Sequence, residues 1–340
     1  MRGRFSDVLL DKDVIRLFSQ SALKEELSLA KLSNPRRLTL KKALFYIHRD
    51  RYLWLLVLPC IAYFVIFAYI PMGGVILAFK NYIPTKGIWG SSWVGFKYFQ
   101  DFFASPYFGR LLRNTVLLSV FNILWSFPVP VIFALFLNEV KNGPFKKIVQ
   151  TVSYMPYFIS VVVLAGMVVN FLSPYGGIAN KLIGLFGMES INFLAEPKYF
   201  RTIYIASGIW QGFGYSSIIY LSTISSIDPQ LYEAAKIDGA RRFQRMAHIT
   251  FPGILPTVVI MLILSFGNIM SVGFEKINLL YSPATYETAD VISTYVYRRG
   301  ILDAQYSFGT AVSLFNSVIN FGLILLVNKI SRRVSDISLW

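Results

Sequence analysis

The protein has 340 residues, of which 55% are hydrophobic and 15% are charged. A soluble domain carries about a quarter charged residues, so this composition argues against a soluble globular protein and indicates an integral membrane protein. The net charge of +15 is also found in nucleic-acid-binding proteins. Here the cations lie between long uncharged runs, which favours a role in membrane topology.

The first 52 residues are predicted to be a basic cytoplasmic segment. No sustained apolar run follows the first cations before Leu53, so the sequence predicts no signal peptide. Residues 8–32 mix Leu, Val and Ile with charges and predict an amphipathic helix, and the stretch NPRRLTLKK at 34–42 predicts a basic linker near the membrane surface.

A transmembrane permease domain is predicted over residues 53–330, because six runs there are long enough to cross the hydrocarbon core. None of the six contains Asp, Glu, Lys or Arg, and several contain proline, which predicts bends within a helix bundle. The runs are Leu53–Phe79, Thr115–Leu137, Ile148–Leu172, Ile203–Ile224, Phe251–Phe274 and Phe308–Val327. The predicted fold class is therefore an all-α membrane protein with six transmembrane helices.

The distribution of cations predicts which side of the membrane each segment faces. If the N-terminus is cytoplasmic, 22 of the 33 Lys and Arg residues lie in cytoplasmic segments. This agrees with the excess of Lys and Arg that cytoplasmic loops of membrane proteins carry. Six spans return the C-terminus to the same side, so both termini are predicted to be cytoplasmic, with residues 331–340 as a tail.

The charged stretch at 228–252, between the fourth and fifth runs, predicts two short helices. Asp228 followed by Pro229 is a strong helix start, and Gly239 is a natural helix end. A second helix is predicted to follow, with Phe243 and Met246 on one side. A DNA-binding helix-turn-helix has similar features, but its place between two membrane spans argues against that function. A solvated amphipathic loop remains an alternative.

The sequence EAAKIDGARRFQRMAHITFP within this stretch resembles the EAA loop of binding-protein-dependent ABC importer permeases. The family pattern is E-A-A, three residues, G, nine residues, I, one residue, L-P, with Phe251 here replacing the usual leucine. The stretches YIPMGGVILAFKNY, FPVPVIFALFLNEV, QTVSYMPYFIS and YVYRRGI resemble the carbohydrate-uptake branch, in particular polysaccharide permeases of the Lpl/Ytc type. The resemblance covers about residues 50 to 335.

The resemblance implies a type I ABC importer permease bundle with a cytoplasmic EAA coupling helix. It implies a bacterial inner-membrane subunit that takes up oligosaccharides or polysaccharide fragments, is not an enzyme and binds no cofactor. The implied partners are a second permease subunit, two ABC ATPase subunits that hold ATP and magnesium, and an extracytoplasmic solute-binding protein. The residues implied in coupling to the ATPase are Glu233, Ala234, Ala235, Asp238, Gly239, Ile249 and Pro252. The chain has no Walker A lysine loop, which fits this interpretation.

The spans on either side of the loop carry the candidate residues of the substrate path. Gln211, Gly212 and Tyr215 lie close together on the fourth span, and Ser265 and Asn268 share a face of the fifth. In maltose-type permeases the corresponding helices contact the sugar. Close helix packing explains the same residue types equally well.

Two other classes of membrane protein are alternatives to the importer. An ion-coupled secondary transporter usually needs internal repeats or acidic residues within its spans, and none of the six runs contains an acidic residue. A membrane enzyme needs grouped carboxylates or a metal. The two histidines, His48 and His248, are far apart in sequence, so no metal site is predicted. Arg298 and Arg299, in a predicted outer segment, are either solvated or paired with acidic residues of the binding protein.

Overall fold

A computed structural model describes residues 49–267, 269–270 and 272–334. The chain divides after Gly73 into two compact units, and each is described by itself. The helix predicted at 8–32, the linker at 34–42 and most of the tail at 331–340 lie outside the described residues.

The described part of the first unit is helical. It comprises α3 (Arg51–Phe64), the π-helix η1 (Val65–Tyr69) and α4 (Ile70–Met72), and η2 (Gly73–Phe79) follows. Together they make an apolar helix from Arg51 to Phe79, which confirms a helix over the first predicted span.

A small β-hairpin begins the second unit. β1 (Lys80–Asn81) pairs antiparallel with β2 (Ser92–Trp93), and Lys80 lies opposite Trp93. The short helices η3 (Pro84–Lys86) and α5 (Gly87–Gly90) form the connection between the strands, and α6 (Lys97–Phe103) comes after them.

The second and third predicted spans differ in how straight they are. α7 (Phe108–Ser126) and α8 (Pro128–Glu139) form one apolar helix of 32 residues that begins earlier than predicted. The third span is not one straight helix: α9 (Pro144–Tyr154) and η4 (Met155–Phe158) meet α10 (Val161–Leu172) at a bend of 100°. Pro156 and the Ser160 side chain, which accepts a hydrogen bond from the Val163 N–H, end one helix and begin the next. α11 (Ile178–Leu185) then follows.

The remaining helices complete the bundle. They are α12 (Pro197–Ser225), α13 (Pro229–Ile237), α14 (Arg242–Arg245), η5 (Met246–Thr250), α15 (Phe251–Gly267), α16 (Phe274–Leu280), η6 (Pro283–Thr285), α17 (Tyr286–Ala289), α18 (Ile292–Val296), η7 (Tyr297–Leu302) and α19 (Tyr306–Val334). The helix of the fifth predicted span runs without a break from Arg242 to Gly267. Its α15 part begins at the predicted Phe251 but ends at Gly267, before the predicted Phe274. Its first residues were predicted to be a separate helix and are its first turns.

Among the described residues, four helices are long and apolar enough to cross a membrane, or five if the bent pair counts as one span. The predicted fourth span, Ile203–Ile224, lies within α12 but is not one of these helices. The serines, glycines and Gln211 within it lower its hydropathy. The chain is thus an all-α multi-pass membrane protein, and the count of six spans stays a prediction.

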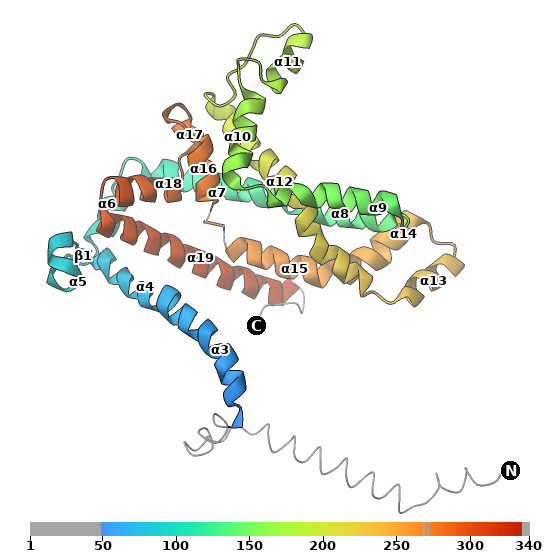
Figure 1. The fold of residues 1–340 in the computed structure, drawn as a ribbon, viewed down its shortest axis with the longest axis horizontal. Helices are drawn as coiled ribbons and strands as arrows, with labels where there is room; N and C mark the ends of the chain where they lie inside the picture. Colours follow the sequence, from blue (N-terminus) through green and yellow to red (C-terminus); the bar gives the residue numbers. More distant parts are fainter. Residues whose placement is uncertain (1–48, 268, 271, 335–340) are drawn as a thin grey trace, which may run out of the picture. The chain divides into compact units, whose positions relative to one another are not determined.

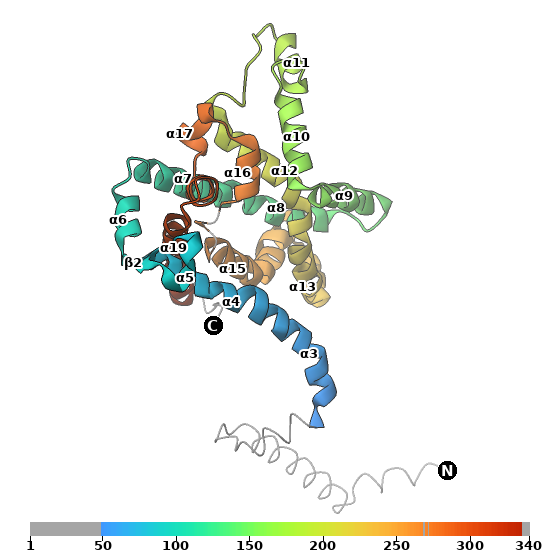
Figure 2. The same ribbon diagram turned by 60° about the vertical axis from the view of Figure 1, so that its left-hand side comes forward.

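The long helix α12 is at the centre of the second unit. It packs against α7, α8, α9 and α15, and α15 packs against α19. α17 lies beside the N-terminal part of α12, whereas α13 follows its C-terminal end, as Figures 1 and 2 show from two directions. Buried apolar side chains form separate clusters near each end, one around Phe200 and Ile277 and another around Tyr220 and Ile254.

Candidate functional site

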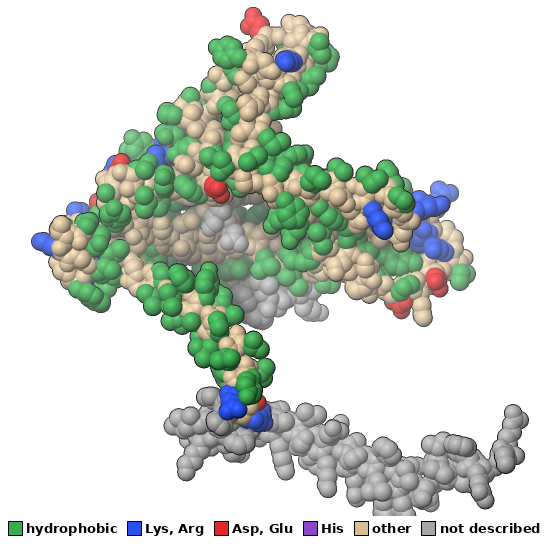
Figure 3. Space-filling model, viewed as in Figure 1, with side chains coloured by type: hydrophobic (Ala, Val, Ile, Leu, Met, Phe, Trp, Pro, Cys, Tyr) green, Lys and Arg blue, Asp and Glu red, His purple; other side chains and the backbone are tan. Residues whose placement is uncertain are grey.

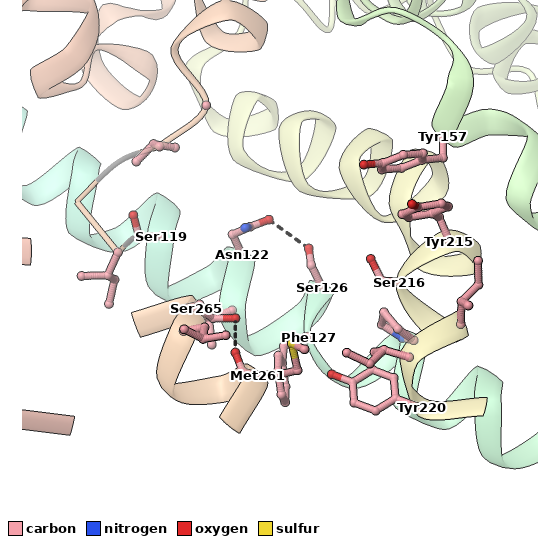
Figure 4. A pocket seen from close by; sticks show the side chains of 18 of the residues that line it. Ser119, Asn122, Ser126, Phe127, Tyr157, Tyr215, Ser216, Tyr220, Met261 and Ser265 are labelled. Atoms are coloured by element: carbon pink, nitrogen blue, oxygen red, sulfur yellow. Dashed lines mark hydrogen bonds between the residues drawn. The ribbon is translucent and has the colours of Figure 1, made fainter. Parts of the chain in front are cut away.

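A pocket of about 900 Å³ opens among the helices that surround α12. Its wall is formed by α7, α8, η4, α12, α15 and the segment that leads from α15 to α16. Figure 4 shows hydroxyl and amide groups from α7, α12 and α15 around this space. The volume lies within the range of small-molecule sites, and a mixture of aromatic and uncharged polar groups is typical of their linings.

One wall is a polar stripe on α7. Ser119, Asn122 and Ser126 follow one another at three- and four-residue spacing, so they share a face of the helix. The Ser126 hydroxyl donates a hydrogen bond to Asn122 Oδ1 over 2.9 Å. Sequence reasoning missed all three residues, although polar side chains at helical spacing within an apolar run were a detectable signal.

The opposite wall carries a stacked pair of tyrosines. The Tyr157 ring, from η4, lies parallel to the Tyr215 ring, from α12, with 3.8 Å between ring centroids and 4° between planes. The hydroxyl ends of both rings project toward the same space (Figure 4). The two residues are 46% and 41% exposed, so the rings are available to a ligand. Tyr157 was also missed, because only the break between η4 and α10 brings it to the pocket.

The predicted path residues divide between the pocket and the helix packing. Tyr215 and Ser265 line the pocket, and the Ser265 hydroxyl donates to the Met261 carbonyl over 2.8 Å. Gln211 instead donates from Nε2 to the Ile159 carbonyl over 2.8 Å, which satisfies the backbone at the break before α10. Neither Gln211 nor Gly212 is among the lining residues. Asn268 lies outside the described residues.

A buried carboxylate joins three segments beside the N-terminal half of α12. Asp290 is fully buried and accepts two 2.8 Å hydrogen bonds from Arg298 Nη2 and one of 3.2 Å from Arg110 Nη2. Asn114 donates from Nδ2 to the Asp290 carbonyl and accepts at Oδ1 from Arg201 of α12. Arg298 is therefore paired inside the chain, and neither hypothesis made for it from the sequence describes this contact.

The charge of Arg298 is stabilised by these contacts. Burial by itself disfavours a guanidinium, but the hydrogen bonds to Asp290 and to the Tyr281 hydroxyl raise the pKa of Arg298 above its ordinary value. Arg299 pairs with Asp303 at 3.1 Å, an exposed contact within one helical turn.

The stretch 228–252 has the helix ends that its sequence predicts. Asp228 Oδ1 accepts a hydrogen bond from the Gln230 N–H over 2.9 Å, so α13 is capped at its start. At its other end Gly239 has φ of 78°, and the Ala240 N–H donates to the Ala235 carbonyl over 2.8 Å. These are the features of a glycine-terminated helix, and the predicted helix is confirmed.

Two contacts attach α13 firmly to the bundle. The Tyr232 hydroxyl shares a hydrogen bond of 3.0 Å with the hydroxyl of Thr250, which is fully buried. Gly253 lies so close to the Ile227 side chain that an added Cβ would clash with it. The loop is therefore held in a defined position rather than hanging free.

The outer surface of this stretch is exposed and partly apolar. Leu231, Ile237 and Phe243 are 53%, 87% and 69% exposed, and Glu233 lies exposed among them. Lys and Arg side chains gather over the same end of the unit, where α9 and α14 lie (Figure 3). An apolar patch with a charged border is typical of a protein interaction site.

A multi-pass bundle with a polar pocket inside it and a fixed helical loop outside it defines a membrane transport protein. The chain belongs to the family of binding-protein-dependent transport system inner membrane components, whose model matches residues 131–336.

Relatives of known name agree with this assignment. The polygalacturonan/rhamnogalacturonan transport system permease protein YteP of Bacillus subtilis is 43% identical over 87% of this chain and 92% of its own. Protein LplB of the same organism is also 43% identical, over 84% and 90%. A crystal structure of a bacterial ABC transporter that imports the acidic polysaccharide alginate contains a chain of 45% identity, with a TM-score of 0.80 over 86% of this chain and 99% of that one.

These findings confirm the importer interpretation. The chain is a non-catalytic permease component of an ABC sugar importer, it is embedded in the membrane, and it works with an extracytoplasmic binding protein. Family membership therefore favours this function over an ion-coupled secondary transporter or a membrane enzyme.

Proposed function

We propose that this chain and a second permease subunit form the translocation path for acidic oligosaccharides, and that two ABC ATPase subunits power it from the cytoplasm. ATP and magnesium are held by those ATPases and not by this chain. The pocket with its stacked tyrosines is the observation that carries the proposal. Sugars pack their C–H faces on aromatic rings and offer hydroxyls to Ser and Asn, and this lining presents both kinds of group.

The substrate class follows from the relatives. YteP is named for polygalacturonan and rhamnogalacturonan, and the similar solved transporter imports alginate, also an acidic polysaccharide. A solved complex of that transporter includes its periplasmic protein with an alginate pentasaccharide bound. We infer that fragments containing uronic acids are the substrates of this chain.

The loop at 228–252 is the proposed contact with the ATPase. Its helix α13 is capped at both ends and tied to buried Thr250, so a push on it is transmitted to the bundle. The exposed Leu231, Ile237 and Phe243 supply apolar contacts, and Glu233 supplies a charge-assisted hydrogen bond to a partner cation. Ala234, Ala235, Asp238, Ile249 and Pro252 complete the proposed coupling residues.

The orientation of the chain in the membrane follows from the charges at the end of the second unit that carries the loop at 228–252. Lys and Arg side chains gather beside α9 and α14, and the positive-inside rule places such an end in the cytoplasm. We infer that both termini lie there too.

Reconstitution into proteoliposomes with the second permease, the ATPases and the binding protein tests the coupling. Glu233→Lys and Gly239→Pro are each expected to abolish substrate-stimulated ATP hydrolysis and uptake while the chain still inserts. Glu189→Lys, the same charge reversal at another exposed glutamate, is the matched control and is expected to behave as the wild type. Unchanged coupling in both loop variants would refute the docking proposal, and uptake driven by an ion gradient without ATPase would refute the importer mechanism.

The pocket is tested in the same preparation. Tyr157→Ala and Tyr215→Ala are expected to raise the KM for oligosaccharide uptake while basal ATP hydrolysis stays unchanged. Tyr175→Ala, at a tyrosine that is 94% exposed and outside the pocket, is the control. Wild-type KM in both pocket variants would show that sugar does not use this surface.

A further inference from the structure

A buried lysine lies beside the pocket. Lys276, in α16, is only 9% exposed. Its ammonium donates a hydrogen bond of 2.6 Å to the Tyr204 carbonyl and lies 4.5 Å from the centre of the Tyr204 ring. Because it is buried, the pKa of Lys276 is lowered to about 8. The ammonium form still predominates at neutral pH.

This charge has no counterion within the part of the chain that the structure describes. No carboxylate there lies within salt-bridge distance of Lys276. Its neighbour Glu275 is exposed. Lys276 also occupies the first turn of α16, where the helix dipole disfavours a cation. The Tyr204 carbonyl and ring contact the ammonium but do not neutralise its charge, so a carboxylate brought beside it would form a charge-assisted hydrogen bond.

The surroundings of the ammonium belong to the pocket wall. Tyr204 and Gly273, which flank it on α12 and before α16, both line the pocket. Gly208 follows Tyr204 by one turn, and a Cβ at Gly208 would lie 3.1 Å from Lys276 Nζ. Helical spacing places Gly208 on the same stripe of α12 as Tyr204 and Tyr215. The missing side chain at Gly208 therefore leaves room for the ammonium beside α12, next to the lining residue Tyr204.

Among the described residues, the lining contains no charged side chain. Tyrosine rings, serines and an asparagine can select a sugar by its shape and its hydroxyls, but they supply no positive charge to attract the carboxylate of a uronic acid. An ammonium has three donors, and the Tyr204 carbonyl takes one of those on Lys276.

We propose that Lys276 is a specificity-determining residue that pairs with the carboxylates of acidic sugar units as they pass through the pocket. The ligand class is a uronate, bound by charge-assisted hydrogen bonds from Nζ at the Tyr204 end of the pocket. The inference rests on the proposed function, because it requires that saccharides use this pocket.

The test compares trigalacturonate with its fully methyl-esterified form, which keeps the sugar units but replaces each carboxylate with an uncharged methyl ester. Uptake and stimulated ATP hydrolysis are measured in proteoliposomes that contain the complete transporter, with Lys276→Met against the wild type. The KM for trigalacturonate is expected to rise roughly tenfold to a hundredfold, as loss of a charge-assisted hydrogen bond implies. The maximal rate and the KM for the ester are expected to stay unchanged. Lys181→Met, at an exposed lysine of α11, is the control.

Gly208→Ala gives an independent arm if Lys276→Met does not assemble. The added methyl group of Gly208→Ala presses on the ammonium, so this variant is expected to show the same loss of preference for the acid over the ester. Gly212→Ala, whose methyl group enters open space, is the control and is expected to keep the preference. Equal effects on both probes, or none on either, in an assembled variant would overturn the role of Lys276. A wild-type transporter that moves neither probe would instead overturn the proposed function.

Discussion

Replacement of Asp290 by alanine tests how the segment after α17 is held against α7 and α12. The substitution removes the only carboxylate that pairs with Arg110 and Arg298 among the described residues. It also removes one of the two acceptors of the Thr294 hydroxyl. Both arginines then remain in place without a counterion, so the damage exceeds the loss of the bonds themselves.

The size of the effect follows from the burial of each group. Removal of one partner from a buried ion pair costs about 3–5 kcal/mol. Asp290 has no exposed side-chain surface, but Arg298 and Arg110 are 22% and 35% exposed and regain some water. We therefore expect the lower end, about 3 kcal/mol, which for 340 residues corresponds to a fall in Tm of roughly 4 °C.

The assay is thermal unfolding of the purified protein in lipid nanodiscs. Asp303→Ala is the matched control, because it removes an ion pair of the same type whose side chains are 43% and 47% exposed. An exposed pair of this kind is worth about 0.5 kcal/mol, so its Tm is expected to change by only about a degree. If the two variants melted at the same temperature, the claim that the Asp290 network stabilises this region would be wrong.

Three further predictions concern single positions. Gly214→Ala is expected to lower Tm by overpacking, at a cost of about 1–3 kcal/mol, because its methyl group meets the α9 backbone; Gly212→Ala, with no atom nearby, is expected to leave Tm unchanged or slightly raised. The free energy of unfolding is expected to rise by up to about 3 kcal/mol between pH 8 and 10.5, because Lys276 loses its proton near pH 8 in the folded protein and near 10.5 in the unfolded one. Lys276→Met is expected to lose this rise. An identical pH profile for the variant and the wild type would contradict the assignment of the rise to Lys276. Tyr232→Phe is expected to cost about 1 kcal/mol through the lost bond to Thr250 and to lower the sugar imported per ATP hydrolysed; an unchanged ratio in proteoliposomes would show that this bond does not transmit force.

Local signals in the sequence predicted the loop at 228–252 well. Asp228, Pro229 and Gly239 determine the backbone through their own side chains or the lack of one, so the ends of α13 could be located without knowledge of the rest of the fold. The apolar runs predicted the helical membrane class for a similar reason, because the hydrocarbon core sets their length and composition.

Features that depend on distant segments could not be predicted in this way. Pro156 alone does not predict the 100° bend before α10, because membrane helices tolerate proline. The bend also depends on Gln211 of α12, whose side chain donates a hydrogen bond to the Ile159 carbonyl at the break. Tyr157 and the α7 stripe line the pocket only because that bend and the packing around α12 bring them there. The Asp290 network joins residues up to 180 positions apart, and nothing in the local sequence indicates such a pairing.

The unbroken length of α12 has a mechanical consequence. Its 29 residues rise about 43 Å at 1.5 Å per residue, so a rotation of only 5° about one end displaces the other by roughly 4 Å. Arg201 bonds to Asn114 near one end of α12, the proposed coupling loop continues from the other end, and the stacked Tyr215 lies between them. A helix without an internal hinge moves as one rigid rod, so a small angular change at the end that leads to α13 becomes an ångström-scale displacement of the pocket wall that contains Tyr215.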